Sequence, residues 1–446
     1  MRASVPQPVA SRVTSTAFVT SAALLTIVAS VVILMVAMTR RTYDMLGAFL
    51  LVLALFAATM PIARRIARQE GDPSMLRLIM LALACKLVGS LLRYYVIFTV
   101  YGGNADAYTY HLGGAHFAHA LQRGTFVMPS GHGIGEQLIQ IVIGTIYTFV
   151  GPTRVGGFLA FSWISFWGLF LFYRAFRISF PAGDHRRYAR LVFFLPSLLF
   201  WPSSIGKEAW MLLTLGVAAY GAARALAHRP GGFVLFALGL WGAGTVRPHV
   251  ALIGVAALLV AYPFRRSRVA GIRSQTSKAI GIALLCLAAL LAVGRVERFF
   301  GVRSLEGGGA GQALLRTQQQ TGEGGSTFHV SNPNSLWSLP KDAFTVLYRP
   351  LPYESHNAQS VVASLEGLFL LVLTLASIRR LYRAATLFPR APYVLFVAAM
   401  VIVFSFAFSN IANFGILTRQ RSQVLPFFLV LLCVPAKVDA EELVEV

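Results

Sequence analysis

The chain has 446 residues, of which 56% are hydrophobic and only 13% are charged. Soluble globular domains carry about 25% charged residues, so this composition excludes an ordinary soluble protein and indicates a polytopic helical membrane protein. The formal net charge is +22, but the arginines flank apolar runs, which favours a role in membrane topology over nucleic-acid binding.

Continuous apolar runs predict an all-α membrane protein with about twelve transmembrane helices. The predicted spans are residues 16–38, 44–63, 75–100, 154–173, 189–203, 208–226, 232–246, 249–263, 279–294, 360–378, 391–408 and 423–435. The predicted divisions are N-terminal helices over 1–101, an outer loop with interfacial helices over 102–153, a helix core over 154–294, an outer flexible loop over 295–358, and C-terminal helices over 359–446.

The distribution of Lys and Arg predicts how these helices are oriented. Short loops that alternate along the chain carry clusters of basic residues, for example Arg174–Arg190 and Arg265–Lys278. Basic loops stay on the cytoplasmic side, which places both termini in the cytoplasm. The pattern holds only if the apolar segment Gly135–Val150 does not span. We therefore expect that segment to form an interfacial or re-entrant helix on the outer face.

The segment Gly102–Gly133 is the first long polar interruption of the chain, and Asp106 is its one carboxylate. An aspartate at the start of a helix can simply serve as the N-cap. The alternative is that Asp106, held at the lipid–water boundary, removes a proton from an acceptor hydroxyl as a catalytic base. Three neighbouring side chains are expected to line the substrate, namely Tyr108, Tyr110 and His111.

Five charged residues lie at the predicted outer ends of later helices. They are Lys207, Glu208, Arg247, Arg419 and Arg421. Glu208 can merely favour the dipole of its first turn, or it can be a second catalytic acid that faces Asp106. The basic residues oppose the positive-inside trend, so they either extend to lipid headgroups or neutralise the phosphate of a lipid-linked donor.

Two further groups of polar residues have open interpretations. The turn Leu347–Asn357 carries side chains that could line a sugar, unless Ser355 or Asn357 only caps the next helix. These side chains are Arg349, Tyr353, Glu354, His356 and Asn357. Lys86 and Arg93 lie seven residues apart on one face of an apolar helix, and Glu366 is a candidate ion-pair partner for them inside the bundle.

Four motifs follow one another along the chain. DAYTYHLGGAHFAHALQRGTF begins at Asp106, and GEQLIQIVIGTIYTFVGPTRVGGF is an apolar segment that ends in a glycine turn. LPSLLFWPSSIGKEAWMLLTLGVAAYG contains Glu208, and WGAGTVRPHVALIGVAALLVAYPF contains Arg247. In this order, over Ala105–Phe264, the sequence resembles the GT-C class of polyprenyl-phosphate-dependent glycosyltransferases, in its bacterial mannosyltransferase and aminoarabinose-transferase-like branch.

The resemblance implies a GT-C-like fold with juxtamembrane helices on the outer face and an inverting sugar transfer. In that class a carboxylate of the first outer loop acts as base, an acceptor hydroxyl attacks the anomeric carbon, and a lipid phosphate leaves. The class often has two adjacent acids in this loop, whereas Asn104 and Ala105 precede a lone Asp106 here, which argues against a metal bridge. No cofactor is expected with certainty, and a divalent cation is the weaker alternative.

The implied partners are a polyprenyl-phosphate-linked sugar donor, a glycan, lipid or protein acceptor, and membrane lipid. The implied location is the cytoplasmic membrane of a bacterium, with the site on the extracytoplasmic face. Two other functions fit the same residues. One is a polysaccharide polymerase or ligase that uses a lipid-pyrophosphate-linked glycan and relies on outer arginines. The other is a flippase or transporter with a path through Lys86, Arg93 and Glu366.

Overall fold

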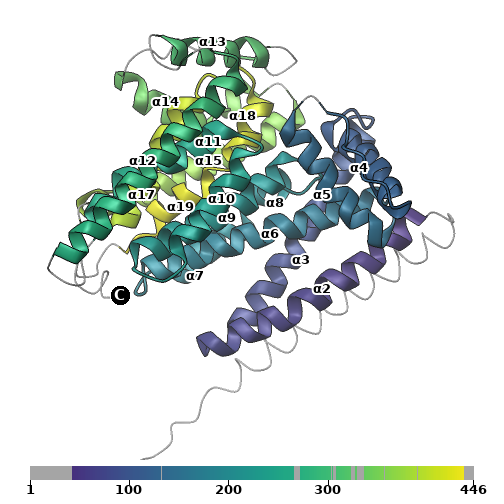
Figure 1. Cartoon of the computed structure of the whole chain (residues 1–446), viewed down its shortest axis with the longest axis horizontal. Helices are drawn as coiled ribbons and strands as arrows, with labels where there is room; N and C mark the ends of the chain where they lie inside the picture. The colour runs from purple at the N-terminus through teal and green to yellow at the C-terminus, as the bar shows by residue number, and fades with distance from the viewer. Residues whose placement is uncertain are drawn as a thin grey trace, which may run out of the picture.

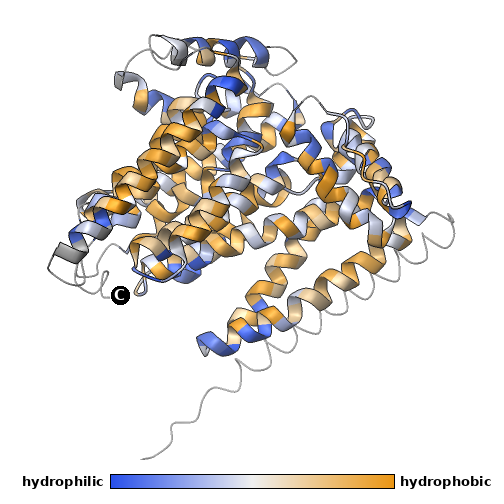
Figure 2. Ribbon diagram, viewed as in Figure 1, coloured by the Kyte–Doolittle hydropathy of each residue, from blue (hydrophilic) through white to orange (hydrophobic). Residues whose placement is uncertain are grey.

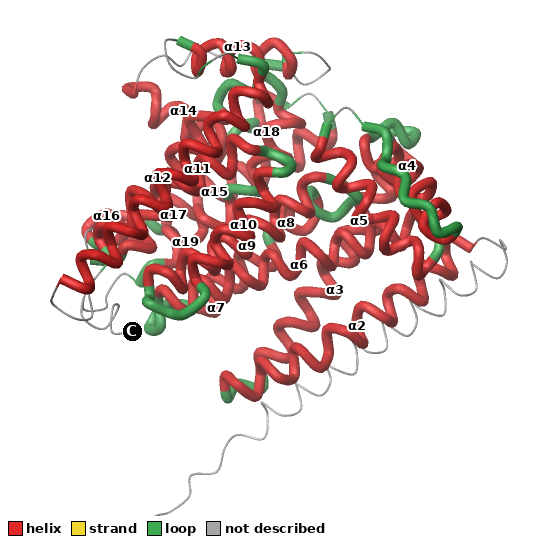
Figure 3. The backbone as a smooth tube through the Cα atoms, in the orientation of Figure 1, coloured by secondary structure: helices red, strands yellow, loops and turns green. Residues whose placement is uncertain are grey.

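The computed structural model describes residues 43–131, 133–265, 272–302, 304, 308–322, 327–328, 336–355, 357–388 and 390–435. Within these ranges the chain is helical, apart from loops and one isolated antiparallel bridge between Thr327 and Asn413 (Figure 3). The first predicted span, residues 16–38, lies outside the described residues. The structure is thus an all-α bundle, as the apolar runs predicted.

The helices follow one another along the chain (Figure 1). They are α2 (Tyr43–Glu70), α3 (Ser74–Tyr95), η1 (Val96–Val100), α4 (Asp106–Gln122), α5 (Ile134–Val150), α6 (Arg154–Ser179), α7 (His185–Phe194), α8 (Pro196–Phe200), α9 (Lys207–Leu226), α10 (Gly232–Gly244), α11 (Pro248–Ala261), η2 (Tyr262–Phe264), α12 (Ile272–Phe300), α13 (Gly309–Thr321), η3 (Leu336–Ser338), α14 (Leu339–Tyr348), η4 (Pro352–Glu354), α15 (Ala358–Ala376), α16 (Ile378–Thr386), α17 (Pro392–Phe408), α18 (Phe414–Arg421) and α19 (Leu425–Cys433).

Six helical segments in the described part of the chain are long and apolar enough to cross a membrane. They are Tyr43–Glu70, Ser74–Val100, Arg154–Ser179, Lys207–Leu226, Lys278–Phe300 and Ala358–Ala376. Four more apolar helices are shorter, at 10–17 residues. The length and apolar composition of these helices therefore indicate a membrane protein. The number of twelve spans stays a prediction.

Two of the predicted spans take a different form in the structure. Residues 189–203 are divided between α7 and α8, because Leu195 precedes Pro196 and adopts an extended conformation with ψ 128°. Residues 423–435 contain the nine-residue helix α19, which is roughly 14 Å long and too short to cross a hydrocarbon core by itself. All nine of its residues are buried, as expected for a helix that is apolar on every side.

The centre of the bundle is α9, on which α6 and α10 both pack closely. Glycines allow α6 and α9 to approach. A Cβ atom on Gly168 would lie 2.3 Å from the Leu212 carbonyl oxygen, and one on Gly216 would lie 2.3 Å from the Gly168 oxygen. Apolar side chains on α2, α3, α12 and α15 stay exposed on the outside, where lipid would cover them.

Hydrophilic residues gather at the ends of the bundle, and apolar residues fill the helices between them (Figure 2). At one end of the parallel pair α2 and α6, Arg154 lies 3.8 Å from Asp44. At the other end, Arg174 and Arg177 both pair with Glu70. Arg174 and Arg177, which were predicted to be cytoplasmic, thus lie at the end opposite α4 and the start of α9.

The helices α4 and α5 pack against each other next to the starts of α6 and α9. Their contact is made through Gly114 and Gly144, since a Cβ on Gly144 would lie 2.7 Å from the Gly114 carbonyl oxygen. The apolar segment Gly135–Val150 falls within α5. The close packing on α4 positions the start of α4, and therefore Asp106, beside α9.

Candidate functional site

Glu208 is the centre of a buried cluster of charged side chains. It lies in the first turn of α9 and is only 3% exposed. Its Oε1 atom accepts a hydrogen bond from Arg247 Nη2 at 2.9 Å and forms an ion pair with Arg419 Nε at 2.7 Å. A single carboxylate oxygen therefore holds two guanidinium groups that are far apart in the sequence.

Asp106 lies at the exposed edge of the same cluster. Its Oδ2 atom is 3.4 Å from Arg419 Nη2, and its side chain is 61% exposed. The N-cap position of α4 belongs to Ala105, which is extended, and Asp106 is the first helical residue. The N-cap interpretation of Asp106 is therefore wrong, and its carboxylate is open to a ligand.

Local sequence signals position the two arginines of the cluster. Arg247 is the N-cap residue of α11 and precedes Pro248. Proline disfavours the helical conformation in the residue before it, and Arg247 is accordingly non-helical at φ −139° and ψ 85°. The short helix α18 begins at Asn413, whose Oδ1 accepts from the backbone N–H groups of Gly415 and Ile416. Arg419 follows in the last turn of α18, where a cation favours the helix dipole.

The electrostatic environment keeps Arg419 charged and leaves Arg247 incompletely paired. Burial lowers the pKa of Arg419, but the carboxylates of Glu208 and Asp106 outweigh this effect and hold that pKa above its usual range. Burial lowers the pKa of Arg247 despite its contact with Glu208. The Nη1 atom of Arg247 is buried and has no hydrogen-bond partner among the described residues.

Arg93 lies within electrostatic range of this cluster, although its sequence position suggested an intramembrane ion pair. It interacts electrostatically with Arg419 and Glu208. Its guanidinium carbon lies 4.8 Å from the centroid of the Phe200 ring and 4.7 Å from that of the Trp201 ring. The sequence did hold a signal for this position of Arg93. The residue lies in the last turn of α3, which is the predicted outer end of that helix and the end that leads to Asp106.

The other predicted partners of a phosphate lie elsewhere. Lys207 Nζ is 3.2 Å from Glu136 Oε1 at the start of α5, so its charge is already matched. Arg421 is fully buried, and its Nη1 donates to the carbonyl oxygens of Leu347 and Arg349, at 3.1 Å each. Arg421 thus holds the end of α14 and does not reach the cluster around Glu208.

The aromatic residues of α4 divide between the cluster and the core. Tyr110 is 2% exposed and interacts electrostatically with Asp106 and Glu208. Its burial raises the pKa of Tyr110, and the nearby carboxylates raise that pKa further. His111 Nδ1 lies 2.8 Å from the Tyr147 hydroxyl, and burial lowers the pKa of His111. Tyr108 is 40% exposed and stacks on His111 with ring centroids 6.4 Å apart.

The turn between α14 and α15 is held by its own side chains. Arg349 Nε lies 2.9 Å from Glu354 Oε1, and the Arg349 guanidinium carbon lies 4.5 Å from the centroid of the Phe328 ring. Asn357 caps α15, with its Oδ1 2.8 Å from the Ser360 nitrogen, so the capping interpretation holds for Asn357. Tyr353 is 80% exposed, and His356 lies outside the described residues.

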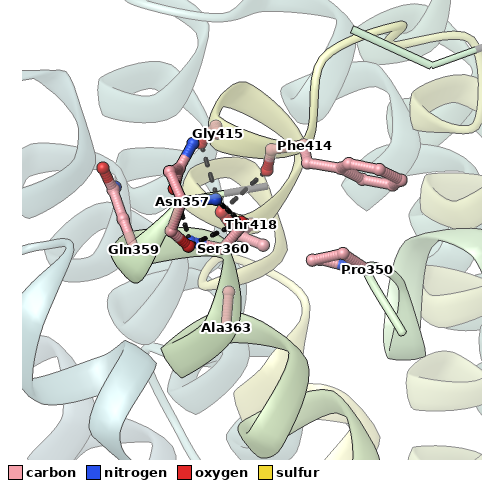
Figure 4. A pocket seen from close by; sticks show the side chains of 8 residues that line it. All are labelled: Pro350, Asn357, Gln359, Ser360, Ala363, Phe414, Gly415 and Thr418. Carbon is pink, nitrogen blue, oxygen red and sulfur yellow. Dashed lines mark hydrogen bonds between the residues drawn. The ribbon is translucent and has the colours of Figure 1, made fainter. Parts of the chain in front are cut away.

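A small pocket lies between the start of α15 and α18 (Figure 4). Asn357, Gln359, Phe414 and Thr418 are among its lining residues. Gln359 Oε1 accepts a hydrogen bond from the Tyr101 hydroxyl, which connects the pocket to the end of η1. Of the residues predicted to line a sugar, Asn357 lines this pocket.

The predicted pairing of Lys86 or Arg93 with Glu366 is wrong. Lys86 Nζ donates to the Leu198 carbonyl oxygen, whereas Glu366 Oε2 accepts from the backbone nitrogen of Ser197 at 2.9 Å and from its hydroxyl at 2.8 Å. The two charged side chains therefore hold opposite backbone groups of the short helix α8. Because the helix is interrupted at Pro196, the Ser197 nitrogen and the Leu198 carbonyl oxygen need hydrogen-bond partners, which these two side chains provide.

Among the described residues, no group of three or more His, Cys, Asp or Glu side chains could hold a metal ion. No protein-family model matches the chain, and no curated protein or solved structure resembles it significantly. The geometry of the charged cluster therefore carries the functional argument.

Proposed function

We propose that the chain is an integral membrane glycosyltransferase. It transfers a sugar from a polyprenyl-phosphate donor to an acceptor hydroxyl on the extracytoplasmic face of a bacterial cytoplasmic membrane. The observation that carries this proposal is the convergence of Asp106, Glu208, Arg247 and Arg419 at one end of the bundle, from four separate segments of the chain.

Such a transfer requires a base for the acceptor hydroxyl and cations for the leaving phosphate, and the cluster contains both. Asp106 is exposed, so an acceptor hydroxyl can reach its carboxylate. The acceptor oxygen forms a bond to the anomeric carbon while the bond from that carbon to the phosphate oxygen breaks. The hydroxyl proton moves to Asp106, and the electron pair leaves with the phosphate. Arg247 and Arg419 are positioned to stabilise the charge that develops on the leaving phosphate.

Glu208 has a different role from Asp106 in this mechanism. It is buried, and its Oε1 atom already accepts from two arginines. Two guanidinium charges beside this carboxylate stabilise its ionised form, so it is a weaker base than the exposed Asp106. We therefore assign Glu208 the task of positioning the arginines, and Asp106 alone the role of base.

The test is the substitution Asp106→Asn in the full-length protein in lipid nanodiscs. General-base catalysis contributes about 10²–10⁴ in rate, so transfer should fall at least about 100-fold while the protein stays folded. The assay supplies a set of polyprenyl-phosphate hexoses and pentoses with a membrane extract as acceptor, and mass spectrometry measures the polyprenyl phosphate released.

The matched control is Asp72→Asn, which makes the same chemical change in the turn between α2 and α3, at the opposite end of the bundle. It should transfer at the wild-type rate. Full activity of Asp106→Asn would remove the central claim. A lipid-pyrophosphate polymerase would instead tolerate Asp106→Asn and lose activity with Arg419→Lys. No contact favours the transport path, since Lys86 and Glu366 both bind the backbone of α8.

A further inference from the structure

Three residues between α12 and α14 contact the segment that leads into α18. The Thr321 Oγ1 atom accepts a hydrogen bond from the Ala412 backbone nitrogen at 3.0 Å, and the Phe328 nitrogen donates to the Ala412 carbonyl oxygen, also at 3.0 Å. Thr327 pairs with Asn413, the N-cap residue of α18, in the isolated antiparallel bridge. The end of α13 and the residues that follow it thus hold both backbone polar groups of Ala412, directly before α18 (Figure 1).

The side chain of Phe328 makes a further connection, to the first residue of α18. Its ring stacks on Phe414 with the centroids 4.1 Å apart and the planes at 9°. The Arg349 guanidinium carbon lies 4.5 Å from the Phe328 centroid and 5.2 Å from the Phe414 centroid, and Glu354 holds this guanidinium in place. Stacking and cation–π contacts favour particular orientations of the groups that make them. These contacts therefore fix the rotation of the first turn of α18 as well as its position.

The helix α18 connects these contacts to the charged cluster. It has eight residues, so it is about 12 Å long, and Arg419 follows Phe414 by five residues. A tilt or rotation at the start of so short a helix changes the distances from Arg419 to Glu208 and Asp106, which are 2.7 and 3.4 Å. At the other end of α18, Arg421 donates to two carbonyl oxygens at the end of α14. Both ends of α18 are thus held by contacts outside the cluster.

We propose that Thr321 and Phe328 are positioning residues for Arg419. They hold the start of α18, and α18 holds the Arg419 guanidinium between Asp106 and Glu208. This inference rests on the proposed function, in which Arg419 stabilises the leaving phosphate, and it gives the segment between α12 and α14 a part in that reaction. The effect of Thr321 and Phe328 on transfer passes through Arg419.

The first test is a double-mutant cycle between Phe328 and Arg419 in the nanodisc transfer assay. Phe328→Ala should lower kcat about tenfold and leave the KM of the donor within about twofold, because Arg419 acts on charge that develops in the transition state. In a background of Arg419→Lys, which keeps the charge and residual transfer, the same change should lower kcat less than about twofold. Phe328→Tyr keeps the ring and should transfer like the wild type. An equal loss from Phe328→Ala in both backgrounds is the result of a merely structural role and would overturn the proposal.

Two threonines of α13 provide a matched comparison. Thr321→Val removes the hydroxyl that accepts from Ala412 but keeps the shape of the side chain, and should lower kcat about threefold. Thr317→Val makes the same change one turn earlier, where the hydroxyl donates within α13, and should transfer like the wild type. Equal rates of the two variants would contradict the role of Thr321. Phe126→Ala, at a ring that is 67% exposed, is the control for the loss of an aromatic side chain.

Amide hydrogen exchange tests the same contacts without sugar transfer. In folded, full-length Phe328→Ala, the amides of α18 should exchange at least about fivefold faster than in the wild type, because local opening of this helix becomes easier. Phe126→Ala should exchange like the wild type, and thermal unfolding verifies that each variant is folded. Unchanged exchange of α18 in Phe328→Ala would overturn the proposal. Faster exchange in a protein that transfers no sugar would contradict only the proposed function.

Discussion

At the scale of single residues, Glu208 decides the geometry of the cluster. It is the only carboxylate of the described chain that two arginines, Arg247 and Arg419, share through one oxygen while it is almost fully buried. Removing one partner of a buried ion pair is strongly destabilising, because the other charges stay buried without compensation. Glu208 therefore supports both the fold and the proposed site.

The substitution Glu208→Gln keeps the shape of the side chain but removes its charge. We expect it to lower the free energy of unfolding by about 3–5 kcal/mol and to abolish transfer, since Arg247 and Arg419 then repel each other without the carboxylate between them. Denaturant unfolding in detergent measures the first effect. The matched control is Glu136→Gln, which breaks the more exposed pair with Lys207 and should cost no more than about 1 kcal/mol. Equal stability of Glu208→Gln and the wild type would contradict this account.

At the scale of helices, the packing of α4 on α5 determines where Asp106 lies. A Cβ on Gly144 would lie 2.7 Å from the carbonyl oxygen of Gly114 and 2.7 Å from a ring carbon of Phe117. A backbone atom cannot rotate away as a flexible side chain does, so any larger residue must push the two helices apart. The start of α4, which carries Asp106, would move with them.

We expect Gly144→Ala to destabilise the protein by about 1–3 kcal/mol through overpacking and to slow transfer more than its stability loss explains. Activity and thermal unfolding are measured on the same preparation. Gly294→Ala in α12 is the control, because a Cβ there meets nothing within 4 Å. That variant should be as stable as the wild type or slightly more so, as alanine favours a helix. Unchanged activity of Gly144→Ala would show that the α4–α5 contact does not position the site.

At the scale of the whole molecule, two groups of ion pairs lie at opposite ends of the bundle. Arg174 and Arg177 bind Glu70 at one end, and Asp106 lies near Arg419 at the other. The helices α4 and α18, which carry this second pair, are labelled in Figure 1. The positive-inside rule then predicts that the first end is cytoplasmic and that the cluster lies on the outer face.

Single cysteines test this orientation. The three native cysteines, Cys85, Cys286 and Cys433, are replaced by alanine. Arg123→Cys at the end of α4 should then react with a membrane-impermeant maleimide on intact spheroplasts of the expressing bacterium. Arg186→Cys in α7 should react only after the membrane is permeabilised. Both positions are exposed, so accessibility within the protein does not limit the reaction. The reverse labelling pattern would place the cluster in the cytoplasm and exclude the proposed extracytoplasmic reaction.

Much of this organisation follows from the sequence because it depends on local patterns. Apolar length predicts the helices, and polar residues at helix ends on one predicted face identified Asp106, Glu208, Arg247 and Arg419, which the structure brings together. The break between α7 and α8 also had a local signal in Pro196. The number of spans and the glycosyltransferase activity stay predictions.

The sequence by itself determined that this is a helical membrane protein with acids and cations at the ends of its helices. Only the tertiary structure decided which cations meet: Arg247 and Arg419 bind Glu208, whereas Lys207 binds Glu136 and Arg421 binds the end of α14. The physical reason is that hydropathy is a property of neighbouring residues along the chain. The direction in which a side chain points depends on the rotation of its helix, which is set by packing against segments hundreds of residues away.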